Sequence, residues 1–250
     1  ATISKYLNGG SLREKNRQAI EQAIRKLDYH VNEYARGLKS NRSRTVGVVI
    51  PELSNLFITQ IIPVMEGVLQ EKGYSVMVCD CRSDPERECR AVRFLLEKRV
   101  DGLIMVGRSI IRDVEDSTFF HKSGMKVVAI GTPADESIHS VQIDNVEAAR
   151  QGCSHLIQLG HRRIAMITGS GTSISAFERE KGYRLALEEA GIPVREEYIV
   201  KGGFTVEGGM AAVDLLEKQG FGGEDGITAI FAQNDLMAIG VLNALRDKKI

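Results

Sequence analysis

Short apolar runs alternate along most of this chain with longer segments whose apolar residues recur at helical spacing. The run at 46–50 ends at Pro51, and the next segment, 55–72, keeps helical periodicity until Gly73. Strands that alternate with helices of about ten or more residues pair in parallel, through right-handed crossovers. The pattern therefore predicts an α/β body with parallel sheets.

The same alternation continues beyond residue 73. We expect strands at 74–79, 100–106, 126–130, 140–143, 163–167, 198–200 and 229–231, and helices at 85–98, 113–122, 146–159, 176–190, 206–218 and 236–246. This succession is long for one open sheet. We therefore expect two doubly wound halves, with a joint near residues 143–146.

The first 44 residues follow a different pattern, that of short helices. Apolar residues at positions 3, 6 and 7 share one helix face, and Asn8 with the glycines after it ends that helix. Ser11 and Glu14 have the spacing of a capping box, which predicts that a second helix begins at Ser11. Asn32 can cap a third, very short helix at 33–39, and an exposed linker follows at 40–44.

The charge of the chain is balanced overall but unevenly distributed. There are 33 basic and 33 acidic residues, yet residues 1–45 hold ten basic and four acidic ones, or 10 − 4 = +6. The remainder therefore carries 23 − 29 = −6. A basic head on an acidic body indicates a nucleic-acid-binding module attached to a part with another role. Composition alone leaves a merely solvated helical cap as the alternative.

Length and composition exclude several classes of protein. With 250 residues, 43% of them hydrophobic, the chain can form two or three domains with real cores. It has no apolar run of about eighteen residues, so we expect no membrane span. It has four cysteines at 79, 81, 89 and 153, with no His or second Cys pair to complete a metal site. We expect small buried thiols in a reducing cytoplasm, no metal and no cofactor. We recognise no secretion signal.

The order of residues in the head resembles that of LacI-type bacterial repressors. The resemblance lies in Thr-Ile-Ser-Lys-Tyr-Leu-Asn-Gly at 2–9, then Asn-Glu-Tyr-Ala-Arg-Gly-Leu at 32–38. In that family the first stretch is the recognition helix of a helix-turn-helix and the second is the hinge helix. The family's first helix would precede Ala1, so the resemblance implies that the head lacks that helix here.

The resemblance implies a set of DNA contacts: Thr2, Ser4, Lys5, Asn8, Asn32, Ala35, Arg36 and Leu38. Thr2 and Lys5 would face base edges in the major groove, with Ser4 and Asn8 near phosphates. Leu38 would wedge between base pairs in the minor groove, flanked by Ala35 and Arg36. Two departures concern the operator sequence: Lys5 stands where the family often has Arg, and Val31 where it usually has Pro.

Family-typical motifs continue through the body. They include Thr-Val-Gly-Val-Val-Ile-Pro at 45–51, Ser-Asn-Leu-Phe at 54–57, Val-Asp-Gly-Leu-Ile-Met at 100–105, Leu-Gly-His-Arg-Arg-Ile-Ala-Met-Ile-Thr-Gly at 159–169, Arg-Glu-Lys-Gly-Tyr at 179–183 and Phe-Ala-Gln-Asn-Asp-Leu-Met-Ala at 231–238. The body also resembles periplasmic sugar-binding proteins. The implied architecture is a small all-α helix-turn-helix head, 1–44, and two doubly wound parallel-sheet subdomains, 45–143 and 144–250. Family members usually extend further, so we expect the C-terminal end of the second subdomain to be missing.

Ligands of open α/β sheets bind beyond the carboxyl ends of the strands. That rule selects the loops at 51–57, 107–109, 131–133, 169–173, 202–204 and 233–235. The resemblance implies effector contacts at Asn55, Phe57, Asp144, Arg179, Phe204, Asn234 and Asp235. Carboxylates, Asn and Arg suit the vicinal hydroxyls of a polyol, and an aromatic ring can cover the C–H face of a sugar.

Three of these residues have a plainer interpretation. Asp144 could be the N-cap of the helix that starts near Val146, and Asp235 the N-cap of the last helix. Arg179 could be a solvated charge on a helix surface. One carboxylate can cap a helix and also bind a ligand, so the sequence leaves both roles open.

The function implied is that of a ligand-responsive, DNA-binding transcriptional regulator, a repressor of carbohydrate-utilisation genes. It would bind double-stranded operator DNA and a sugar or sugar derivative, in the bacterial cytoplasm at the nucleoid, as a homodimer or tetramer that uses the helix near 61–69. In the family, an effector between the two halves rotates them and orders or melts the hinge helices.

Other functions were compared with this one. A solute-binding protein for sugar transport fits the body, although the basic head argues against it. An enzyme that uses a dinucleotide is disfavoured, because Gly169 and Gly171 follow a strand without the third glycine of G-x-G-x-x-G. Some family members bind a phosphorylated carrier protein. Arg82, Arg87, Arg90 and Arg93 could form a basic surface for it, but the sequence favours a solvated helix face for these residues.

Overall fold

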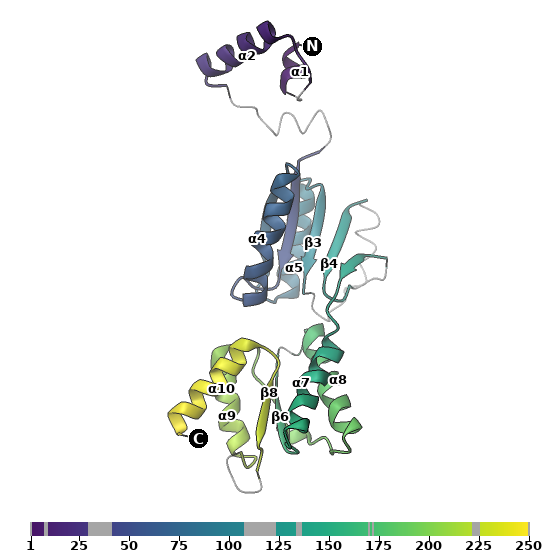
Figure 1. Ribbon diagram of the computed structural model, residues 1–250, viewed down its shortest axis with the longest axis vertical. Helices are drawn as coiled ribbons and strands as arrows, with labels where there is room; N and C mark the ends of the chain where they lie inside the picture. The colour runs from purple at the N-terminus through teal and green to yellow at the C-terminus, as the bar shows by residue number, and fades with distance from the viewer. Residues whose placement is uncertain are drawn as a thin grey trace. The chain divides into compact units, whose positions relative to one another are not determined.

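A computed structural model describes residues 2–7, 10–29, 42–107, 124–133, 137–169, 171, 173–221 and 226–249 (Figure 1). The chain divides into two compact units, residues 1–44 and residues 45–250. The helices expected at 33–39 and 113–122 lie outside the described residues.

The first unit contains helices α1 (Thr2–Leu7) and α2 (Glu14–Lys26), which pack against each other. The Tyr6 hydroxyl donates to Glu21 Oε1 across 3.2 Å, and Arg17 Nε donates to the same oxygen across 3.1 Å. The capping box predicted at Ser11 is wrong. The N-cap residue of α2 is Arg13, so Glu14 is the first helical residue rather than the third, where its carboxylate would be needed.

The first part of the second unit is a five-stranded parallel sheet with strand order β2-β1-β3-β4-β5. Its strands are β1 (Thr45–Ile50), β2 (Ser75–Asp80), β3 (Gly102–Val106), β4 (Lys126–Ile130) and β5 (His139–Val141), joined in part by helices α4 (Leu56–Glu71) and α5 (Pro85–Glu97). The interior strand β1 is buried from Gly47 to Ile50, because helices cover both of its faces. A Cβ at Gly47 would lie 2.8 Å from Leu95 of α5, which explains the glycine.

A second parallel sheet has the order β7-β6-β8. The part of the chain that contains this sheet consists of α7 (Asn145–Gln158), β6 (Ile164–Thr168), α8 (Ile174–Glu189), the 3-10 helix η1 (Glu196–Tyr198), β7 (Ile199–Lys201), α9 (Val206–Glu217), β8 (Ala229–Ala232) and α10 (Asp235–Lys248). Residues of β6 alternate between two cores: Ile164 and Met166 pack with α7 and α8, whereas Ala165 and Ile167 pack with α9 and α10. Figure 1 shows these two helix pairs on opposite sides of the sheet.

Most described helices of the body begin with a capping side chain. The caps are Asn55, Asp84, Asp144, Ser173, Thr205 and Asn234. Asp144 is therefore an N-cap, as its plainer interpretation predicted. The prediction that Asp235 caps the last helix is wrong. Asp235 is already the first residue inside the helix. The cap is Asn234, whose Oδ1 accepts a hydrogen bond from the Met237 amide at 3.0 Å.

The cysteines differ in burial: Cys81 and Cys153 are buried, whereas Cys79 and Cys89 are half-buried. Burial raises the pKa of Cys81 to about 12 and that of Cys153 to about 11, so both stay protonated near neutral pH. Within the described ranges, no helix is long and apolar enough to cross a membrane.

Candidate functional site

The strand order of the first sheet places a switch point between β1 and β3, where the crossovers depart in opposite directions. The loops after these strands meet there. A Cβ at Gly107 would lie 3.4 Å from Pro51 Cγ, in van der Waals contact. Asn55 and Phe57 belong to the same exit: Asn55 Oδ1 accepts the Phe57 amide at 3.0 Å, and the Phe57 side chain is 48% exposed.

Gln233 connects the strand exits of the second sheet. Its side chain is buried, its Oε1 accepts the Gly169 amide at 2.8 Å, and its Nε2 donates to the Ala176 carbonyl at 2.8 Å. One amide therefore fixes the end of β6, the start of α8 and the end of β8. A buried glutamine with both ends paired stabilises that geometry.

Phe204 lies directly against Gly169. A Cβ at position 169 would lie only 1.9 Å from Phe204 Cζ, so the ring fills the space that any other residue would need. The Phe204 backbone has φ +67, a left-handed conformation that is costly for an aromatic residue. Backbone strain of this kind is concentrated at functional sites. The ring is partly buried and packs on the core of α9 and α10.

Asn234 and Asp235 differ in the hydrogen bonds that their side chains make. Asn234 uses both ends of its amide: besides capping α10, its Nδ2 donates to the Phe204 carbonyl at 3.2 Å. This residue therefore positions Phe204. Asp235 is exposed, and its charge acts on Arg179.

The guanidinium of Arg179 is held at the strand exits by two neutral acceptors. Its Nε donates to Asn145 Oδ1 at 3.0 Å, and its Nη1 donates to the Gln233 carbonyl at 2.6 Å. Burial lowers the pKa of Arg179, while the carboxylates of Glu178 and Asp235 act in the opposite direction. An arginine remains charged under such a shift. The side chain is half-buried, unlike a solvated helix charge.

Glu178 joins the two sheets. The Thr132 hydroxyl, in the loop after β4, donates to Glu178 Oε1 at 2.7 Å. Asn145 Nδ2 donates to Glu178 Oε2 at 2.9 Å. Neither these residues nor Gln233 was among the effector contacts expected from the sequence. Thr132 and Gln233 lie in loops that the strand-exit rule had selected, whereas Glu178 carries no signal beyond its place beside Arg179.

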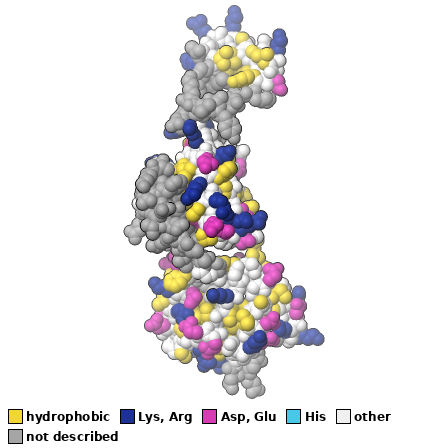
Figure 2. Space-filling model, turned by 180° about the vertical axis from the view of Figure 1, so that it is seen from behind, with side chains coloured by type: hydrophobic (Ala, Val, Ile, Leu, Met, Phe, Trp, Pro, Cys, Tyr) yellow, Lys and Arg dark blue, Asp and Glu magenta, His cyan; other side chains and the backbone are white. Residues whose placement is uncertain are grey.

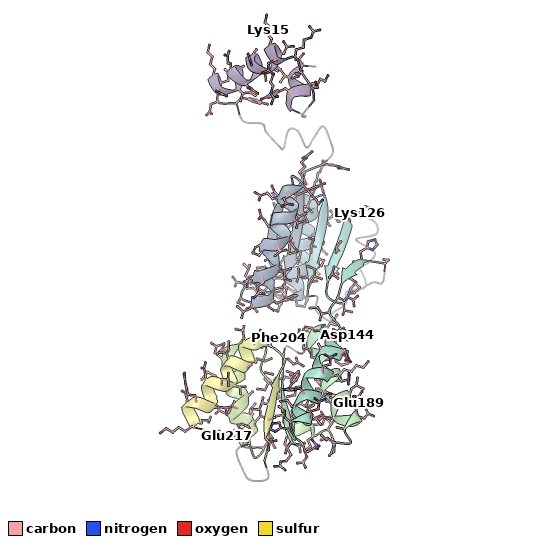
Figure 3. All side chains as sticks on the ribbon, viewed as in Figure 1. Lys15, Lys126, Asp144, Glu189, Phe204 and Glu217 are labelled. Carbon is pink, nitrogen blue, oxygen red and sulfur yellow. The ribbon has the colours of Figure 1, made fainter. Side chains whose placement is uncertain are left out.

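Asp144 is close in the chain to the hydrogen-bonded residues just described, and its side chain is exposed. Its Oδ1 accepts the Glu147 amide at 2.9 Å, so one oxygen caps α7. Figure 3 shows Asp144 and Phe204 at the same end of the half that contains β6, with Glu217 toward the other end. The two residues are therefore placed at the carboxyl ends of the strands, as the strand-exit rule requires.

A cavity of about 310 Å³ lies elsewhere, at the amino end of β6. Arg162, Tyr183 and Tyr198 are among the residues that line it. Because ligands of doubly wound sheets bind at the carboxyl ends, this cavity is not the candidate effector site.

Thr2 and Lys5 are exposed on α1, and the space-filling view shows Lys and Arg side chains around an apolar patch on the head (Figure 2). Ser4 belongs to the same helix. The remaining expected DNA contacts, Asn8, Asn32, Ala35, Arg36 and Leu38, lie outside the described residues.

Two arginines of α5 have carboxylate partners on their own helix or its cap. Arg87 lies 3.6 Å from Asp84, and Arg90 lies 3.5 Å from Glu86. These exposed pairs favour a solvated helix face over a docking surface for a carrier protein.

Comparisons with known proteins show the family of this chain. Residues 43–249 match the family described as periplasmic binding proteins and sugar binding domain of LacI family. The chain is 33% identical to catabolite control protein A of Priestia megaterium, over 99% of this chain and 74% of that protein. It is 28% identical to the HTH-type transcriptional repressor PurR of Vibrio cholerae, over 100% and 73%. The solved complex of the transcriptional regulator CelR with cellobiose superposes with a TM-score of 0.72 and 29% identity, covering 98% of this chain and 73% of that one.

Proposed function

This chain belongs to the LacI family of transcription regulators, and from that premise we propose that it represses carbohydrate-utilisation genes in response to a sugar-like effector. As a member of this family it is a ligand-responsive regulator rather than a solute-binding protein for transport, because its relatives along nearly the whole chain are regulators.

The observation that carries the effector proposal is the placement of Arg179. Its guanidinium is fixed by Asn145 and Gln233, and Gln233 is adjacent in the chain to Asn234, which holds the Phe204 backbone. A fixed hydrogen-bond donor beside an aromatic ring suits a sugar, whose hydroxyls need paired polar groups and whose C–H face needs an apolar one. The CelR relative, solved with cellobiose, supports the same ligand class.

The charge of the site favours an uncharged effector. Asp144, Glu178 and Asp235 supply three carboxylates, against the single positive charge of Arg179. An anionic group would meet this surplus of negative charge at short range. We therefore expect a neutral polyol, with Asn55 and Phe57 contributing from the first sheet.

Operator binding is assigned to residues 1–44. The support is the excess of basic residues there and the exposure of Thr2 and Lys5 on α1. A short helix that presents such side chains can enter the major groove. The hinge residues Asn32, Ala35, Arg36 and Leu38 keep their proposed role at the minor groove, and the protein would act in the cytoplasm at the nucleoid.

A homodimer is supported by helix α4. Val64 is 66% exposed and Val68 is 51% exposed, and both lie on this helix with Leu56 and Phe57. Exposed apolar residues on one helix mark a surface for association. The proposed subdomains are residues 45–143 and 144–250, with the effector between them.

A thermal-shift screen tests the effector site. The chain would be heated with neutral sugars, sugar phosphates, nucleosides and amino acids, because a ligand that binds only the folded state raises Tm with its concentration. We expect a shift with a neutral sugar, and its loss in Arg179→Ala. Arg246→Ala is the control, since that arginine is 78% exposed on α10. A panel without any shift, or a shift that Arg179→Ala retains, would refute the assignment.

A further inference from the structure

The two carboxylate oxygens of Glu178 bind partners from different sheets. Oε1 accepts the Thr132 hydroxyl at 2.7 Å, and Thr132 follows β4 of the five-stranded sheet. Oε2 accepts Asn145 Nδ2 at 2.9 Å, and Asn145 is the first residue of α7 beside the three-stranded sheet. A single side chain on α8 is therefore in contact with both halves of the body.

The Oε2 contact also determines how Arg179 is held. A carboxylate only accepts hydrogen bonds, so the NH2 group of Asn145 must face Glu178. The other end of that amide, Oδ1, must then face away, and it accepts Arg179 Nε at 3.0 Å. Glu178 thus fixes the orientation of the Asn145 amide, and the amide fixes the guanidinium.

The Oε1 contact is the one that a ligand can replace. Thr132 and Glu178 are both half-buried, and the hydrogen bond between them is made by a hydroxyl. A polyol presents the same donor group. Its hydroxyl at Oε1 would release Thr132, and with it the loop after β4, without disturbing Asn145 or Arg179.

We propose that Glu178 is the positioning residue that couples the two halves to the effector site: Oε1 holds the first half through Thr132, and Oε2 orients Arg179 through Asn145. This inference rests on the proposed function for its effector. Its geometry is independent of that function, and so is its test.

The test compares the 250-residue chain with four variants, and a fifth, Arg179→Lys, serves only to assign a signal. Thr132→Val removes only the Oε1 contact, whereas Glu178→Ala removes both. Glu178→Gln keeps both, because its amide oxygen can accept from Asn145 while its NH2 group donates to the Thr132 hydroxyl. Thr59→Val is the control, since it removes a hydroxyl that bonds only within α4, to the Leu56 carbonyl. Circular dichroism and Tm establish that each variant folds.

Two readouts separate the two oxygens. The first is exchange of the Arg179 Nε–H proton by NMR, with the signal assigned through its loss in Arg179→Lys. The second is amide hydrogen exchange by mass spectrometry in peptides 126–133 and 174–180.

We expect Glu178→Ala to accelerate the Arg179 Nε–H exchange about tenfold, the factor that corresponds to roughly 1.4 kcal/mol. Thr132→Val and Glu178→Gln should leave this proton unchanged. We expect amide exchange in both peptides to be faster in Thr132→Val and Glu178→Ala than in the unmodified chain. In Glu178→Gln and Thr59→Val the exchange rates should be unchanged.

An unchanged Arg179 proton in Glu178→Ala would overturn the orienting role. Unchanged peptides in Thr132→Val would overturn the link between the halves. If Glu178→Gln behaved like Glu178→Ala, charge rather than hydrogen-bond geometry would be responsible, and the proposal would fail. Neither readout needs effector or DNA, so a failure here is distinguishable from an empty thermal-shift panel.

Discussion

The ring of Phe204 occupies the space that a side chain at Gly169 would need, with Cζ only 1.9 Å from the position of a Cβ there. The two residues follow β7 and β6, which are adjacent parallel strands. Each requires the other: the glycine admits the ring, and the ring is held although its backbone has φ +67. This contact fixes the aromatic wall of the proposed effector site.

Gly169→Ala should displace the ring and lower the free energy of unfolding by about 1–3 kcal/mol, the usual cost of overpacking. It should also weaken the thermal shift caused by an effector. Urea unfolding at fixed pH measures the first effect. Gly171→Ala is the matched control, because a Cβ there meets nothing within 4 Å. Equal stability of the two variants would show that Phe204 is not held against Gly169.

Gln233→Leu should be strongly destabilising although leucine is similar in size and apolar. It leaves the Gly169 amide and the Ala176 carbonyl without their partner in a buried place, at about 1–3 kcal/mol for each group. Chemical denaturation gives the difference. Gln158→Leu, on an exposed position of α7, should change stability by about 0.5 kcal/mol or less. A small effect at position 233 would mean that water replaces the lost partners.

Glu147 should make the free energy of unfolding depend more steeply on pH in the acidic range. Hydrogen bonds from Arg150 and Gln151 lower the pKa of Glu147 from its ordinary 4.5 to about 2. Because the folded-state pKa is the lower one, the contribution is complete above about 4.5 and is lost as pH falls toward 2. In Glu147→Gln, the urea midpoint should therefore depend less on pH between these two values. Parallel profiles for the two proteins would refute the shift.

Lys5→Ala should weaken binding to duplex DNA and lower the slope of log K against log salt by about 1, if Lys5 contacts one phosphate. A change at a base edge would instead relax sequence preference, because base contacts carry the specificity. Fluorescence anisotropy over a salt series distinguishes the two. Lys126→Ala removes the same charge from an exposed position on β4 of the body and should leave the slope unchanged. An unchanged slope together with an unchanged sequence preference in Lys5→Ala would remove this residue from the interface.

Local pattern was sufficient for the helices and strands in the described part of the body. The expected strand at 126–130 and the helix at 206–218 have counterparts in β4 and α9, the latter ending one residue earlier. Hydrophobic periodicity and helix-stopping glycines act within a few residues, so the sequence carries them directly. The parallel sheets follow from the same alternation.

Cap geometry was harder to predict. Ser11 and Glu14 have the spacing of a capping box, and Asp235 is a common cap residue, yet the caps are Arg13 and Asn234. A shift of one or two residues in the helix start changes which side chain meets the free amides. That start is decided by packing as well as by the local residues.

The family, the order of strands and helices, and the separation of a basic head from an acidic body are all evident from the amino-acid sequence, since they depend on the order of residues along the chain. Only the tertiary structure showed that Thr132, Asn145, Glu178 and Gln233 form one hydrogen-bonded network around Arg179. Thr132 and Gln233 are a hundred residues apart in the chain. Strand pairing and crossover direction bring such residues together at one edge, and no local pattern records which donors and acceptors will meet there.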